Sequence, residues 1–261
     1  MNFIKENVLK LIETNMIYSA NNSLRWLVLF LIINCLSSTN VLAQSNVGNK
    51  YGLNVVNKLK LVQNEITLDS NKKMVDVLRE IPTVVLDLKY ASINNFMHVK
   101  LYPTLHTTYL RLPAVNALRK VVADLEIKGL TIKIFDAYRP YATTEQMWER
   151  VKDSRYAADP SKGSGHNSGI AVDVTIVDLR TKKEITMPTG FDNFSDTAHQ
   201  DFMQLPEAVL QNRLLLKRTM EKYGFVPLET EWWHFSLPDP DHYELLDLSF
   251  DDLKKLSKQK H

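Results

Sequence analysis

The hydrophobic and polar positions of this chain predict helices and strands that follow one another without regular alternation. Apolar residues recur at helical spacing in three stretches: 113–128, 143–151 and 206–223. Pro113 suits a first helical turn, and Gly129 and Gly224 suit C-terminal caps. Short β-rich or apolar runs predict four strands: 83–90, 130–135, 170–177 and 231–237. No linker divides the chain, so we expect one compact α+β domain, with a Gly- and Ser-rich loop at 161–169.

The N-terminal segment has a different pattern from the rest of the chain. An unbroken apolar run, 27–33, follows Arg25 and is too short to span a bilayer, which needs about 20 apolar residues. An A-x-A-like cleavage site ends at Ala43. We therefore expect an exported protein, periplasmic or secreted and without a membrane span after cleavage, in two parts: a signal peptide, 1–43, and a mature domain, 44–261. The alternatives are a lipoprotein anchored through Cys35, an uncleaved anchor or a buried core helix.

Length and composition narrow the class of protein. The 261 residues carry 32 Lys and Arg against 30 Asp and Glu, which gives a formal net charge of +2. This balance excludes a strongly basic nucleic-acid binder and a charge-driven disordered chain, so we expect no nucleic-acid partner, and it is compatible with a small-molecule partner. The single cysteine, Cys35, lies in the predicted signal. The mature domain would therefore hold a metal only through nitrogen and oxygen ligands.

A first group of polar residues lies around the predicted strand 170–177. His166 is flanked by glycines, and Asp173 follows seven residues later within an apolar strand. Strand alternation places Asp173 on one face with Ala171 and Thr175, where the small Ala leaves room for an ion or a ligand. A carboxylate is costly to bury there unless it is paired or binds a metal. The alternative is an Asp that pairs with an Arg or caps a loop.

A second group is the sequence Glu231-Trp232-Trp233-His234. The two aromatic residues are expected to form a shaped, partly dry pocket wall between the carboxylate and the imidazole. Residues three apart do not share a face of a regular strand, so a common site requires a bend, or requires Glu231 to reach in from the start of the strand. The alternative is a pair of core tryptophans with a hydrogen-bonded His.

Taken together, the two groups predict a metal site. His166, Asp173 and His234 form the two-His, one-carboxylate set of catalytic zinc sites, and the same set also suits non-haem iron. Glu231 would then remain unligated as a general base, which favours hydrolysis. Arg139, in the sequence that follows strand 130–135, offers a fixed cation for an oxyanion, or else a surface salt bridge.

These motifs resemble the zinc D,D-peptidase family that includes the VanX-type D-alanyl-D-alanine dipeptidases. The resemblance covers about residues 83–238, and its motifs are Ser164-x-His166-x-x-Gly169-x-Ala171-x-Asp173, Glu231-x-Trp233-His234, Asp136-Ala-Tyr-Arg139-Pro140, Asp87-Leu-Lys-Tyr90-Ala with Asn95-Phe96, and Gly190-Phe-Asp192-Asn-Phe-Ser195. It implies a hedgehog- or D,D-peptidase-like fold, in which a central antiparallel sheet flanked by helices carries one zinc ion.

The resemblance also implies roles for individual residues. His166, Asp173 and His234 would be the ligands, Glu231 the catalytic base and Arg139 the transition-state stabiliser. Ser164 and Asp192 would lie near the ends of a bound dipeptide, with Asp192 pairing with its ammonium.

The expected activity is hydrolysis of D-Ala-D-Ala to two D-Ala. The predicted export favours turnover or salvage of cell-wall dipeptide over antibiotic resistance. The alternatives are a D,D-carboxypeptidase that acts on peptidoglycan stem peptides, a non-catalytic zinc-containing wall-binding domain, and an iron oxygenase.

Overall fold

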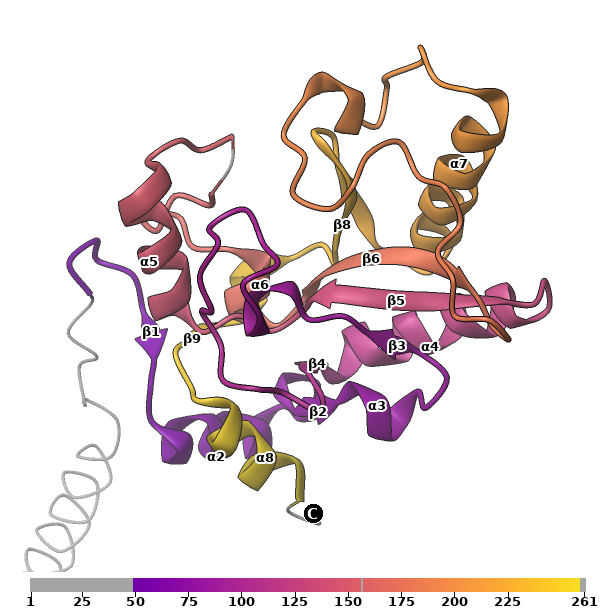
Figure 1. Cartoon of the computed structure of the whole chain (residues 1–261). Helices are drawn as coiled ribbons and strands as arrows, with labels where there is room; N and C mark the ends of the chain where they lie inside the picture. The colour runs from indigo at the N-terminus through magenta and orange to yellow at the C-terminus, as the bar shows by residue number, and fades with distance from the viewer. Residues whose placement is uncertain (1–48, 156, 259–261) are drawn as a thin grey trace, which may run out of the picture. The chain divides into compact units, whose positions relative to one another are not determined.

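A five-stranded sheet in the order β3-β5-β6-β8-β7 organises the computed structural model, which describes residues 49–155 and 157–258 (Figure 1). The strands are β3 (Val85–Leu86), β5 (Leu130–Asp136), β6 (Ala171–Asp178), β7 (Val226–Leu228) and β8 (Glu231–Ser236). Neighbours from β5 to β7 pair antiparallel, whereas the edge strand β3 pairs parallel with β5. The α+β class is confirmed, and the sheet is antiparallel except at this edge.

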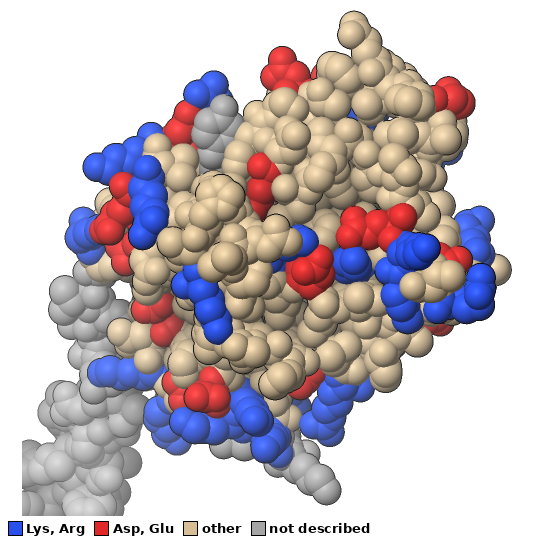
Figure 2. All heavy atoms as spheres, in the orientation of Figure 1, with Lys and Arg blue, Asp and Glu red and all other residues tan. Residues whose placement is uncertain are grey.

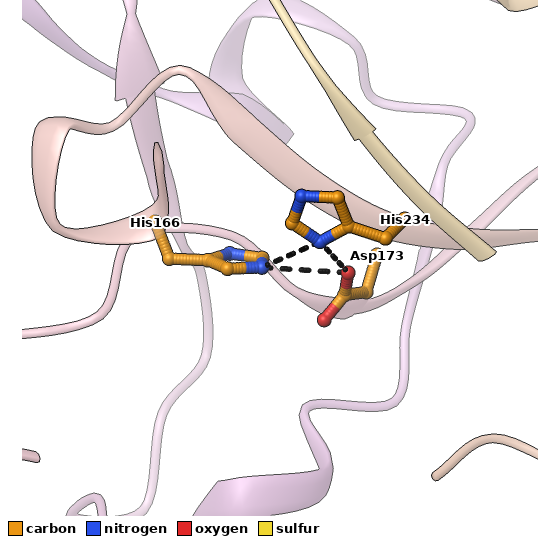
Figure 3. A group of neighbouring side chains, drawn as sticks. All are labelled: His166, Asp173 and His234. Atoms are coloured by element: carbon orange, nitrogen blue, oxygen red, sulfur yellow. Dashed lines mark hydrogen bonds and ion pairs between the residues drawn. The ribbon is translucent and has the colours of Figure 1, made fainter. Parts of the chain in front are cut away.

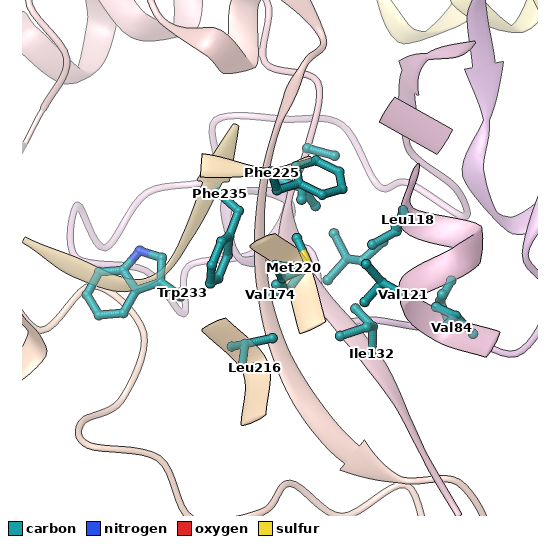
Figure 4. Close-up of a cluster of buried hydrophobic side chains, with 14 of the residues drawn as sticks. Val84, Leu118, Val121, Ile132, Val174, Leu216, Met220, Phe225, Trp233 and Phe235 are labelled. Carbon is teal, nitrogen blue, oxygen red and sulfur yellow. The ribbon is translucent and has the colours of Figure 1, made fainter. Parts of the chain in front are cut away.

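Two long helices cover the sheet with the main apolar core. The α4 helix (Leu112–Glu126) packs against β5, and α7 (Glu207–Lys222) packs against β7, β8 and α4. Figure 4 shows side chains from both helices meeting side chains of the strands in one buried cluster, among them Leu118, Val121, Ile132, Val174, Leu216 and Phe235. The two long helices predicted from apolar spacing are therefore confirmed to within about two residues at each end.

Shorter elements surround this core. The remaining helices in the described part of the chain are α2 (Leu59–Leu68), α3 (Val77–Glu80), α5 (Tyr141–Val151), α6 (Gly165–Ser168) and α8 (Phe250–Lys258). Four 3-10 turns lie at Ser70–Lys72, Lys89–Ala91, Asp196–Ala198 and Pro240–His242. Two small sheets pair β1 (Val55–Val56) with β9 (Leu245–Leu246), and β2 (Met74–Asp76) with β4 (Tyr109–Arg111). No helix among residues 49–155 and 157–258 is both long and apolar enough to cross a membrane.

Two local predictions were wrong. In the stretch 83–90 only β3 pairs as a strand, because the chain then turns over the end of the sheet and buries Tyr90. The predicted loop 161–169 contains the helical turn α6. The Ser164 side chain accepts a hydrogen bond from the His166 N–H at its start, and Gly169 ends it with a φ of 73°.

The predicted signal peptide, 1–43, lies outside the described residues. On the surface in view, Lys and Arg lie among Asp and Glu and do not form one extended basic field (Figure 2). This distribution agrees with the near-neutral composition.

Candidate active site

Three side chains from three elements converge beside the paired strands β6 and β8 (Figure 3). The β6–β8 register places Asp173 directly opposite His234, and α6 brings His166 beside them. The His234 Nδ1 lies 2.9 Å from Asp173 Oδ1 and 3.2 Å from His166 Nε2, and His166 Nε2 lies 3.4 Å from Asp173 Oδ1. One nitrogen or oxygen from each residue therefore points to a common centre.

This triangle has the size that a metal ion requires. Ligand atoms at about 2.0–2.1 Å from a tetrahedral zinc lie about 3.3 Å apart, close to the three separations observed. His166 Nδ1 lies 2.8 Å from the Ala137 carbonyl oxygen, a hydrogen bond that leaves Nε2 to act as the ligand. Burial opposes ionisation of Asp173, but the charges and hydrogen bonds of the two imidazoles outweigh it and hold the pKa of this carboxyl well below its usual range. The donor set fits a divalent cation with an open coordination position.

Glu231 lines the same pocket as His234 although the two residues are three apart. The pairing of β7 with β8 shifts register between Pro227 and Leu228, and Glu231 is the first residue of β8. Glu231 thus joins the pocket from the irregular start of the strand. This is the second of the two geometries that the sequence allows, the first being a bend within the strand. Burial raises the pKa of the Glu231 carboxyl; His234 opposes this shift and Asp173 adds to it. A raised pKa suits a group that takes up and returns a proton.

Arg139 is 6% exposed, which excludes the alternative of a surface salt bridge. Its Nε and Nη2 donate hydrogen bonds of 3.0 and 2.8 Å to the same carboxylate oxygen, Asp136 Oδ2. The other oxygen, Asp136 Oδ1, accepts a hydrogen bond of 3.0 Å from the Tyr102 hydroxyl. The guanidinium is therefore fixed along one edge by a buried acid, and Arg139 lines the pocket.

The two residues predicted near the substrate ends both line the pocket and have different partners. Ser164 caps α6, since its Oγ accepts the His166 N–H at 3.2 Å. Asp192 accepts hydrogen bonds of 3.1 and 3.3 Å from the Tyr90 hydroxyl. Burial raises the pKa of Asp192 well above its usual range, and the charge of Asp173 adds to the shift. Among the described residues this acid has a neutral hydroxyl partner and no ion pair, so a bound cation would stabilise its charged form.

One pocket of about 210 Å³ contains all seven predicted site residues: Ser164, His166, Asp173, Asp192, Glu231, His234 and Arg139. Of the two tryptophans expected in its wall, Trp233 lines the pocket. Trp232 is not a lining residue; it is buried and donates its indole N–H to Thr189 Oγ1 at 2.9 Å. The pocket is smaller than the roughly 300–1,000 Å³ of sites for drug-sized ligands. Its size suits a ligand of a few residues at most.

Sequence reasoning assigned no role to several residues around this pocket. Asp136 holds Arg139, Tyr102 holds Asp136, and Tyr90 holds Asp192. Asp136 and Tyr90 lie within two of the family-like motifs, Asp136-Ala-Tyr-Arg139-Pro140 and Asp87-Leu-Lys-Tyr90-Ala. Membership of a motif is the sequence signal that could have identified them. Nothing in the sequence around Tyr102 marks it, because its partner is 34 residues away.

Fold and site together define the class: an α+β domain with a metallopeptidase-type centre. Comparison with known proteins gives the family. The peptidase M15 family described as D-Ala-D-Ala dipeptidase matches residues 70–254. The D-alanyl-D-alanine dipeptidase of Escherichia coli (strain K12) is 34% identical over 179 residues, which cover 69% of this chain and 92% of that protein. The chain therefore belongs to the D-Ala-D-Ala dipeptidases of the peptidase M15 family.

Two further similarities are weaker. A D-alanyl-D-alanine dipeptidase of Streptomyces coelicolor (strain ATCC BAA-471 / A3(2) / M145) is 30% identical, covering 60% of this chain and 89% of that protein. A solved structure described as VanYB in complex with D-Alanine-D-Alanine aligns at 13% identity with a TM-score of 0.34, covering 51% of this chain and 74% of that one. The structural likeness is too low to carry an argument about the site.

Proposed function

We propose that this protein hydrolyses the dipeptide D-Ala-D-Ala to two D-Ala, with one zinc ion held by His166, Asp173 and His234. The observation that carries the proposal is that these three residues share one small pocket with Glu231 and Arg139, in a chain whose relatives are named D-alanyl-D-alanine dipeptidases. Zinc bound there would supply Lewis acidity for the attacking water and the scissile carbonyl.

Glu231 and Arg139 divide the remaining chemistry. The Glu231 carboxylate accepts one proton from the attacking water as the water oxygen bonds to the carbonyl carbon. Glu231 then donates that proton to the amide nitrogen as the C–N bond breaks. The second proton of the water passes from the new carboxyl group to the released amine, so the products are a carboxylate and an ammonium. The Nη1 of Arg139 is not used by Asp136, so the guanidinium keeps donors for the oxyanion that develops on the carbonyl oxygen.

The ends of the pocket support a free dipeptide over a stem peptide. The Asp192 carboxylate, held by Tyr90, would pair with the substrate ammonium, and the Ser164 end would receive the carboxylate. A stem peptide replaces the ammonium with a neutral amide and would leave the buried Asp192 without its cation.

Replacing Glu231 tests the enzymatic proposal against a non-catalytic zinc domain. Glu231→Gln is expected to lower kcat about 10²–10⁴-fold on D-Ala-D-Ala while zinc content stays near one per chain. Glu229→Gln, an exposed neighbour two residues earlier, is the matched control and keeps full activity. Retained activity in Glu231→Gln would contradict the role of the base. Activity that requires iron and a co-substrate would contradict the hydrolytic zinc site.

We also propose that the enzyme acts outside the cytoplasm in turnover or salvage of wall-derived dipeptide, after removal of residues 1–43. The apolar run 27–33 and the cleavage-like sequence ending at Ala43 support this location. Mass spectrometry of the exported protein is expected to find Gln44 as the first residue. A mature chain that begins at a lipid-modified Cys35 would instead support the lipoprotein alternative.

A further inference from the structure

The active-site pocket shares a wall with a second cavity. This cavity of about 380 Å³ is larger than the active-site pocket of about 210 Å³ and lies between segments 89–98 and 190–192. Two residues line both spaces, Phe96 and Asp192. Since Asp192 is the residue proposed to pair with the substrate ammonium, the second cavity lies beyond the N-terminal end of a bound dipeptide.

The segment that carries Phe96 is held in place by one buried amide. The Asn95 Nδ2 donates hydrogen bonds to the carbonyls of Ser92 and Val99 at 2.7 and 2.8 Å, and to that of Lys89 at 3.3 Å. Its Oδ1 accepts the Met97 N–H at 2.9 Å. Both functional groups of the amide are thus bonded to the loop backbone on either side of Phe96, which fixes the position of the ring.

The Phe96 ring is also packed by aromatic neighbours. It meets Phe194 edge-on at 5.3 Å and Tyr90 edge-on at 6.3 Å between ring centroids. Tyr90 in turn holds the Asp192 carboxylate through its hydroxyl. Phe96 and Asp192 are therefore two parts of one ordered wall, joined through Tyr90.

We propose that Phe96 is a specificity-determining residue that restricts this enzyme to free dipeptides by closing the active-site pocket against the second cavity. The inference rests on the proposed function. An acyl group on the substrate nitrogen would extend past Asp192, into the space that the Phe96 ring now blocks. Asp192 selects for the ammonium charge, and Phe96 excludes the atoms that an N-terminal extension adds. Without the ring, the second cavity becomes the subsite for an N-acyl group.

The test compares binding of D-Ala-D-Ala and N-acetyl-D-Ala-D-Ala to the zinc-loaded Glu231→Gln protein by calorimetry, with turnover measured in the parent enzyme. Phe96→Ala is expected to improve the ratio of acetylated to free dipeptide binding by at least about 10-fold. Leu228→Ala is the matched control, because Leu228 lines the active-site pocket but not the second cavity. It is expected to leave that ratio unchanged. Phe96→Leu, which keeps a branched apolar side chain, gives a smaller shift in the same direction and serves if Phe96→Ala does not fold.

Two results would overturn the inference alone. One is an unchanged ratio in folded Phe96 variants that still bind D-Ala-D-Ala. The other is a parent enzyme that already accepts the acetylated dipeptide as well as the free one. If the parent enzyme neither binds nor hydrolyses D-Ala-D-Ala, the proposed function fails, and the inference fails with it.

Discussion

Arg111 and Arg139 are both buried in this fold, yet their guanidinium groups are used differently. Arg111 is fully buried, and each of its three nitrogens bonds to a carbonyl oxygen: Nε to Ser168 at 2.8 Å, Nη1 to Lys72 at 2.5 Å and Nη2 to Glu244 at 3.3 Å. The Glu244 carboxylate lies 3.4 Å away and completes an ion pair. Arg111 thus joins three segments of backbone.

Arg139 instead bonds through Nε and Nη2 to one carboxylate oxygen, Asp136 Oδ2, and its guanidinium lies 5.1 Å from the centroid of the Tyr90 ring. Neither bond to Asp136 uses Nη1, and the residue lines the active-site pocket. A guanidinium that a carboxylate fixes along one edge at a pocket wall can present its other edge to a ligand. Arg111 is therefore a structural cross-link, whereas Arg139 is available for chemistry, although both are buried arginines.

The largest expected effect is on stability, at Arg111. Arg111→Ala removes the donor to three carbonyls and leaves the Glu244 carboxylate with Lys72 as its remaining ion-pair partner, so the free energy of unfolding is expected to fall by about 3–5 kcal/mol. Urea denaturation measures this change. Arg119→Ala removes a half-exposed arginine that pairs with Glu80, and is expected to cost no more than about 1 kcal/mol. Equal costs for the two variants would contradict the structural assignment of Arg111.

The next largest effect is on catalysis, at Arg139. Arg139→Lys keeps the charge but loses the planar fork that binds Asp136 on one side and the oxyanion on the other, so kcat/KM on D-Ala-D-Ala is expected to fall about 10²–10³-fold. Arg111→Lys is the cross-control: it lowers stability, and the folded fraction keeps its kcat/KM. A comparable loss of kcat/KM in both lysine variants would remove the distinction between the two arginines.

The sequence predicted the parts of this site that lie in local motifs. Spacing and residue type pointed to His166, Asp173 and His234, which the structure brings together. Strand geometry allowed Glu231 to join them either through a bend or from the start of the strand, and the β7–β8 register shift lies at that start. Helix boundaries at α4 and α7 followed from apolar spacing with proline and glycine at the ends. These features depend on residues near one another in the chain.

The features that sequence did not predict depend on distant contacts. The Asp136–Arg139 pair is local, but its burial depends on Tyr102, which donates to Asp136 from 34 residues away, and no local pattern encodes that contact. The turn at α6 was missed because its length is four residues, too few for a periodic pattern. Likewise β3 is short because the chain leaves the sheet to bury Tyr90.

A smaller effect is expected at Asp136, the partner that gives Arg139 its orientation. Asp136→Asn keeps an oxygen acceptor but loses the negative charge, so a hydrogen bond to a charged group worth about 1.5–3 kcal/mol is weakened and kcat falls about 10-fold or more. KM is expected to change less, because the substrate does not contact Asp136. In a double-mutant cycle with Arg139→Lys the losses are less than additive; additive losses would show that Asp136 acts on activity by another route.

The smallest effect is expected at Tyr102, whose hydroxyl donates to the second oxygen of the acid that holds Arg139. Tyr102→Phe removes the hydroxyl that donates to the Asp136 carboxylate. The free energy of unfolding is expected to fall, and the activation free energy for kcat to rise, each by about 0.5–1.5 kcal/mol. Tyr141→Phe is the matched control, because its buried hydroxyl donates to the Pro160 carbonyl and no arginine lies behind that bond. Tyr141→Phe is expected to lower stability and leave kcat unchanged. If the two variants lose the same stability and neither loses kcat, the Tyr102 hydroxyl stabilises the fold but does not help to orient Arg139 for catalysis.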